Sequence, residues 1–134
     1  MQVLRSVALI AMAVIAVVPT VTAQDVRHET VRFARGTSGT TIQDSITGYN
    51  SVRYSLRANA GQTVSVRLDT SNASNFFNVS VPGASEALFI GSIKGNSTSF
   101  VIPSGGDYAI DVYLMRNAAR RNETANYTLA IHIE

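Results

Sequence analysis

The sequence predicts an all-β protein, a single-domain antiparallel β-sandwich of about eight short strands. Apolar and polar residues alternate with a period of two in several segments, which is the pattern of strands with one face on a core and the other in water. Clusters of Gly, Pro, Asn and Ser separate these segments and mark turns. The 134-residue chain has no Cys, so the fold depends on one hydrophobic core and not on disulfides.

The first 23 residues are expected to be a secretory signal peptide. Arg5 supplies the positive charge, residues 7–18 are apolar without a break, and residues 21–23 form a small-residue cleavage site. As a helix, the apolar stretch spans roughly 18 Å, which is less than the ~30 Å hydrocarbon core of a membrane. We therefore predict a cleaved signal over residues 1–23 and one domain over residues 24–134. Export without Cys is typical of a bacterial periplasm, and no membrane anchor is expected.

Four segments show the strand alternation most clearly. Their core-facing apolar positions are Tyr54 and Leu56; Val64, Val66 and Leu68; Tyr108, Ile110, Val112 and Leu114; and Tyr127, Leu129, Ile131 and Ile133. Shorter strands are predicted over residues 76–81, 88–93 and 99–102. The intervening turns fall at residues 60–62, 82–83, 94–96 and 103–107.

The segment 116–125, which reads RNAARRNETA, interrupts this pattern between two clear strands. It is longer than an ordinary hairpin loop of two to five residues, and its paired alanines favour one helical turn. A helical turn places Arg116 and Arg120 on one face at positions i and i+4, beside Arg121. Arginine pairs bidentately with carboxylates, so this projection suits an acidic cleft. The alternative is a solvated loop in which Arg120 pairs with Glu123.

Catalytic and nucleic-acid-binding arrangements are not found. The net charge of +2 argues against a general nucleic-acid binder. His28 and His132 lie far apart in the sequence and are too few for a histidine zinc site. Asp107 is expected in a turn; if it instead shared a strand with Asp111, the two would lie roughly 13–14 Å apart, beyond the spacing of about 6.5–9.5 Å in inverting glycosidases. We expect no enzyme activity and no cofactor.

Residues 113–131, which read YLMRNAARRNETANYTLAI, resemble the carboxy-terminal signature of the periplasmic inhibitors of g-type (goose-type) lysozyme. The shared pattern is Arg-Asn, a small pair ending in Ala-Arg, a basic residue and Asn, followed by the Tyr that opens the last strand. Residues 46–49, 60–62 and 103–108, together with Tyr54, are similar to further segments in the sequences of the same family. The resemblance covers residues 46–134.

This resemblance implies a β-sandwich that blocks the active-site cleft of a g-type lysozyme. The family places a tyrosine and two arginines against the catalytic region of the enzyme, and these fall on Tyr49, Arg116 and Arg120. Tyr54 is the alternative tyrosine, and Arg121 completes the predicted lysozyme-binding set. The expected partner is therefore a protein, g-type lysozyme, held by arginines against a catalytic carboxylate and by the tyrosine as an anchor.

Two other functions stay open at this point. Secreted pre-peptidase carboxy-terminal domains share the strand rhythm, which allows a carbohydrate-binding sandwich. Exposed aromatic side chains on one sheet would favour that function, and the possible ones are Phe76, Phe77, Phe89 and Tyr113. A structural or adhesion subunit would need an unpaired donor strand, for which residues 24–34 are available although they are polar.

Overall fold

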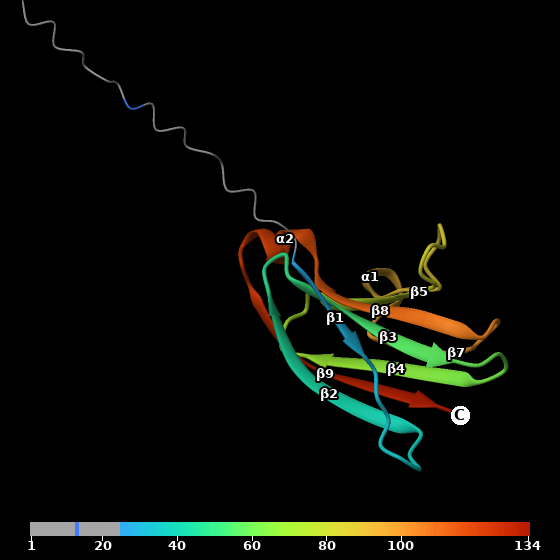
Figure 1. The fold of residues 1–134 in the computed structure, drawn as a ribbon. Helices are drawn as coiled ribbons and strands as arrows, with labels where there is room; N and C mark the ends of the chain where they lie inside the picture. Colours follow the sequence, from blue (N-terminus) through green and yellow to red (C-terminus); the bar gives the residue numbers. More distant parts are fainter. Residues whose placement is uncertain (1–12, 14–24) are drawn as a thin grey trace, which may run out of the picture.

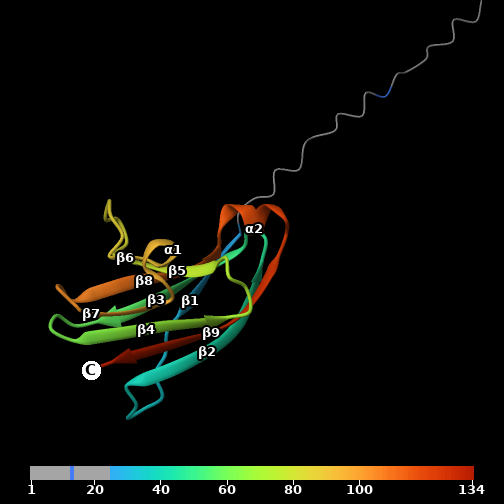
Figure 2. The same cartoon turned by 180° about the vertical axis from the view of Figure 1, so that it is seen from behind.

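The computed structural model describes residue 13 and residues 25–134. Residues 25–134 fold into two sheets packed face to face (Figures 1 and 2). The predicted signal peptide lies, but for residue 13, outside the described residues. One sheet contains, in spatial order, β1 (Val26–Thr30), β3 (Ser51–Ala58), β8 (Gly106–Leu114), β5 (Asn75–Ser80) and β6 (Phe89–Ile90). The other contains β2 (Gly39–Thr47), β9 (Thr124–Ile133), β4 (Thr63–Thr70) and β7 (Ser97–Val101). Two short helices are α1 (Gly91–Lys94) and α2 (Arg116–Arg120).

The predicted antiparallel all-β sandwich is confirmed, except that one strand pair is parallel. Every paired strand in the described part of the chain is antiparallel except β1, which runs parallel to β3 at the edge of its sheet. Residues 26–30, considered above as part of a donor strand, are thus already paired within the chain. An adhesion subunit would need an unpaired donor strand, so this pairing argues against that function.

The four alternating segments form β3, β4, β8 and β9, as predicted. Their inward residues are buried, apart from the partly buried Ile133 that packs against the core. The sequence did not predict β1 or β2, because neither shows clear alternation of apolar residues. No described helix is long and apolar enough to span a membrane.

Two predictions of local structure were wrong. The segment 88–93 forms a strand only over Phe89–Ile90, and a helical turn follows in which the amide of Gly95 donates to the carbonyl of Gly91 (2.7 Å). A side chain at Gly91 would clash with the backbone carbonyl of Phe77, at 2.4 Å, so this glycine lets α1 lie against β5. Asp107 lies within β8 and not in the turn, opposite Arg57.

A buried pair of tyrosine hydroxyls joins the two sheets. Tyr54 on β3 and Tyr127 on β9 meet with 2.7 Å between their hydroxyl oxygens. Burial raises the pKa of both hydroxyls, so both remain protonated and the hydrogen bond stays neutral. Nearby, Arg27 on β1 forms an ion pair with Asp44 on β2 and so links the two neighbouring edge strands. These contacts tie together two sheets that share no backbone hydrogen bonds.

We expect Tyr54→Phe to lower the free energy of unfolding by about 1–3 kcal/mol, because it leaves the buried hydroxyl of Tyr127 without a partner. The double variant Tyr54→Phe/Tyr127→Phe removes both hydroxyls and should recover most of this loss. Urea denaturation of the wild type, Tyr54→Phe, Tyr127→Phe and the double variant measures the effect. A double variant whose loss equals the sum of the two single losses would contradict the assigned pairing.

Candidate functional site

The connection between β8 and β9 crosses from one sheet to the other and closes one end of the sandwich. As predicted, it forms one helical turn, α2, seen at the top of Figures 1 and 2. Ala118 and Ala119 are buried against the core, whereas Arg116, Asn117 and Arg120 are exposed. The two alanines thus fix which face of the helix points outward, and that face carries the arginines.

The carboxyl end of α2 is closed by a Schellman motif. Asn122 has a left-handed backbone with φ of 56°, its amide donates to the carbonyl of Ala119 (2.9 Å), and the amide of Glu123 donates to the carbonyl of Ala118 (3.1 Å). Asparagine is one of the few residues other than glycine that visits this conformation readily. The second asparagine of the sequence motif therefore ends the helix.

The turn that carries Tyr49 lies against this helix end. The amide of Gly48 donates to the carbonyl of Glu123 (2.9 Å), and a side chain at Gly48 would come within 2.7 Å of the Asn122 side-chain oxygen. Gly48 also has a positive φ of 61°. Glycine thus allows the β2–β3 turn and α2 to approach closely. The turn brings Tyr49, which is 38% exposed, to the same end as the arginines.

The two candidate tyrosines differ in exposure. Tyr54 is only 1% exposed and its hydroxyl is used inside the core. Of the two, only Tyr49 presents its side chain to the solvent.

Ion pairing divides the nine described arginines into two groups. Arginines with a carboxylate partner are Arg27, Arg53, Arg57, Arg67 and Arg121. Among the described residues, Arg116 and Arg120 have no such partner, and the same is true of Arg32 and Arg35 in the connection between β1 and β2. Two uncompensated guanidinium groups one helical turn apart repel each other. A carboxylate placed between them would relieve this repulsion.

The expected alternative pairing of Arg120 with Glu123 was wrong. The residue that pairs with Glu123 is Arg121, whose Nε and terminal nitrogen both lie 2.6 Å from Glu123 Oε2. Arg121 is the cap residue at the end of α2, and from there its side chain reaches the carboxylate two residues further on. Arg121 therefore belongs to the predicted region but has an internal partner.

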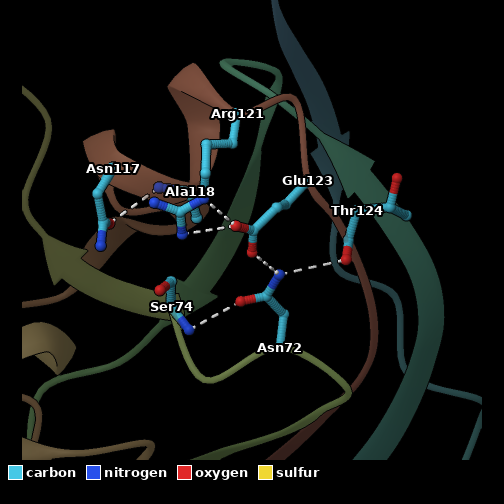
Figure 3. Close-up of polar contacts among 7 residues, drawn as sticks. All are labelled: Asn72, Ser74, Asn117, Ala118, Arg121, Glu123 and Thr124. Atoms are coloured by element: carbon cyan, nitrogen blue, oxygen red, sulfur yellow. Dashed lines mark hydrogen bonds and ion pairs between the residues drawn. The ribbon is translucent and has the colours of Figure 1, made fainter.

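The sequence did not reveal the role of Asn72, in the connection between β4 and β5. Its side-chain nitrogen donates to Glu123 Oε1 (3.0 Å) and to the carbonyl of Thr124 (3.3 Å), and its oxygen accepts from the amide of Ser74 (2.9 Å) (Figure 3). Bonds from Asn72 and Arg121 lower the pKa of Glu123 from its ordinary value of 4.5. The network's contribution to stability is present above that ordinary value and is lost as the pH falls through the lowered one. The only sequence signal was the Asn-x-Ser spacing of an Asx turn.

The structure assembles no metal or histidine-based catalytic cluster in its described part. No three His, Cys, Asp or Glu side chains of residues 25–134 gather in a way that could hold a metal ion. His28 lies on β1 and His132 on β9, in different sheets, and His132 contacts Glu134 (2.9 Å). Asp111 is held by two bonds from Arg53 (2.7 and 3.0 Å).

None of the aromatic side chains named for carbohydrate binding is fully exposed, although Phe76 and Tyr113 lie opposite each other on β5 and β8. Phe77 is buried and stacks near Phe89, with ring centroids 5.1 Å apart. Phe76, Phe89 and Tyr113 are partly buried. The hydroxyl of Tyr113 donates to the side-chain oxygen of Asn78 (3.0 Å).

The fold and this end surface define a class: a small β-sandwich with a basic helical turn fixed at one end. No family model matches the chain. The chain is 34% identical to Aeromonas hydrophila PliG, a periplasmic lysozyme inhibitor of g-type lysozyme, with a TM-score of 0.75 over 82% of this chain and 98% of that one. It is 27% identical over 111 residues to the inhibitor of g-type lysozyme of Escherichia coli K12, covering 81% of this chain and 82% of that protein.

The chain therefore belongs to the family of periplasmic inhibitors of g-type lysozyme, as the sequence motif predicted. A pre-peptidase C-terminal domain of a Bacillus anthracis collagenase shares the fold alone. Its TM-score is 0.55 at 15% identity, over 83% of this chain and 96% of that domain.

Asn122→Ala should lower the free energy of unfolding by about 1 kcal/mol, because alanine tolerates the left-handed conformation poorly. Asn122→Gly is the matched control and should leave stability nearly unchanged, since glycine is the usual residue at this helix position. Urea denaturation compares the two. Equal stability of the Ala and Gly variants would contradict the role assigned to the Asn122 backbone.

Proposed function

We propose that this protein is a periplasmic inhibitor of g-type lysozyme and has no catalytic activity of its own. Family membership supports g-type lysozyme as the target, because the relatives are themselves inhibitors of g-type lysozyme. In this proposal residues 1–23 direct export and are removed, and residues 24–134 are the inhibitor. The expected role is protection of the cell wall against an enzyme that cuts peptidoglycan.

The proposed mechanism is occlusion of the lysozyme cleft by the α2 end of the sandwich. Glycosidases of this kind act with carboxylates in a groove. Arg116 and Arg120 would enter the groove and form charge-assisted hydrogen bonds to a carboxylate, in the place of the sugar. The planar guanidinium holds its orientation better than a lysine ammonium. Tyr49 would pack beside them as an aromatic anchor.

One observation supports this assignment above the others: α2 holds two exposed arginines that have no carboxylate partner among the described residues, at the same end of the sandwich as the exposed Tyr49. Most other described arginines are compensated by acidic neighbours. The helix is fixed by buried alanines and a closed carboxyl end, so little backbone freedom would be lost on binding.

The direct test is residual activity of g-, c- and i-type lysozymes on suspended cell walls, titrated with the purified mature chain. We expect loss of g-type activity at near-stoichiometric ratios and little effect on the other two. Unchanged activity of the g-type enzyme would contradict the proposed function. In that case, a pull-down on peptidoglycan without lysozyme would test for a carbohydrate-binding sandwich.

Arg116→Ala and Arg120→Ala should each weaken inhibition by more than about 1 kcal/mol, or roughly fivefold in the inhibition constant. Arg57→Ala is the control, since Arg57 is an exposed arginine near the far end of β3 with Asp107 as its partner (3.5 Å). Tyr49→Ala should also weaken inhibition. Inhibition constants equal to the wild type for both α2 variants would disprove the site.

A further inference from the structure

The loop of residues 71–74, between β4 and β5, is bonded to the chain on both sides of α2. Before the helix, the amide of Met115 donates to the carbonyl of Ser74 (2.9 Å). After it, Ser71 and Asn126 are joined by two bonds: the Ser71 amide donates to the Asn126 carbonyl and the Asn126 amide donates to Ser71 Oγ, each 2.9 Å. The 71–74 loop therefore brackets the segment that carries the arginines.

Within this bracket, side chains form a continuous path from the loop to the helix end (Figure 3). Asn72 is held by the Ser74 amide and donates to one oxygen of Glu123, and Arg121 donates to the other oxygen. The Arg121 guanidinium is thus directed back onto the protein. Arg116 and Arg120, by contrast, have no bonds of this kind among the described residues.

We infer that Asn72 and Glu123 are positioning residues, which set the direction of Arg116 and Arg120, and that Arg121 acts through Glu123 and not by contact with lysozyme. This inference rests on the proposed function. A helix of five residues does not hold its shape alone, so its orientation depends on its surroundings. Ala118 and Ala119 fix it from the core side, and the path from Asn72 fixes it from the side of the β4–β5 loop.

The competing assignment makes Arg121 a third contact to the enzyme. The two assignments differ for Glu123→Gln, which weakens the internal pair without touching any arginine. If Glu123 positions the helix, this variant inhibits less well than the wild type. If Arg121 is a contact, releasing it from Glu123 leaves inhibition unchanged or improves it.

The experiment is a double-mutant cycle of Arg121→Gln and Glu123→Gln, with Asn72→Ala as a third variant. Inhibition constants are measured against g-type lysozyme, and urea midpoints are recorded for each protein. We expect each single variant to weaken inhibition about twofold to fivefold, the range of an exposed ion pair. The double variant should be no weaker than the worse single one, because both changes break one path.

The matched control is Asp69→Asn. Arg67 and Asp69 form an exposed ion pair at the same spacing of two residues (3.0 Å), on the face of β4. Its loss should change the urea midpoint about as much as Glu123→Gln does and leave inhibition unaltered. Weakened inhibition by this control to the same degree would overturn the inference, because a general loss of stability would then explain both results.

A spectroscopic readout separates this inference from the proposed function. Arg121 Nε–H should be protected from solvent exchange in the wild type, both free and bound to lysozyme, and lose protection in Glu123→Gln. In that variant the amides of Asn122 and Glu123 should exchange faster, while that of Leu129 in β9 stays protected. If the wild type fails to inhibit g-type lysozyme, the proposed function is contradicted. If exchange is the same in wild type and variant, or Arg121 changes its partner in the complex, the positioning inference falls.

Discussion

Burial of alternate side chains between two sheets, without any disulfide, is the constraint on which the rest of this structure depends. The chain has no Cys, so the core must be closed at its ends by the chain itself. β8 and β9 lie in different sheets, and the connection between them has to cross the open end. Ala118 and Ala119 are small enough to close that end as a helical turn. Once they are buried, the arginines on either side of them must face the solvent.

Electrostatic compensation then distinguishes this end from the faces of the two sheets, whereas Arg32 and Arg35 in the β1–β2 connection share its lack of a carboxylate partner among the described residues. Arg53, Arg57 and Arg67 lie beside acidic partners on their sheets, where exposed pairs contribute little to stability but leave little free charge. Arg116 and Arg120 lack such partners among the described residues, and Arg121 is compensated by Glu123. A carboxylate-binding surface needs uncompensated guanidinium groups on a fixed backbone, and α2 has both features among the described residues.

Much of the fold and part of the site could be predicted from the sequence. The features that were predicted depend on residues close together in the sequence, and those that were missed depend on contacts between distant residues. Alternation is local, so β3, β4, β8 and β9 were predicted, and the double alanine predicted the turn of α2. β1 and β2 were missed because neither shows a clear alternation of apolar residues. The segment after Ile90 forms a helical turn packed closely against β5, a tertiary contact that no local pattern reports. Likewise, Tyr54 and Tyr49 could be told apart only by burial, and Asn72 joins Glu123 across 51 residues of sequence.

The central claim is that the α2 end, with Arg116 and Arg120 held outward, is the surface that binds lysozyme. A crystal structure of the complex between the mature chain and a g-type lysozyme tests it most directly. We predict both guanidinium groups within hydrogen-bond distance of carboxylates in the enzyme's cleft, Tyr49 packed beside them, and Arg121 still paired with Glu123. An enzyme bound to the outer face of either sheet, with α2 in solvent, would contradict the account.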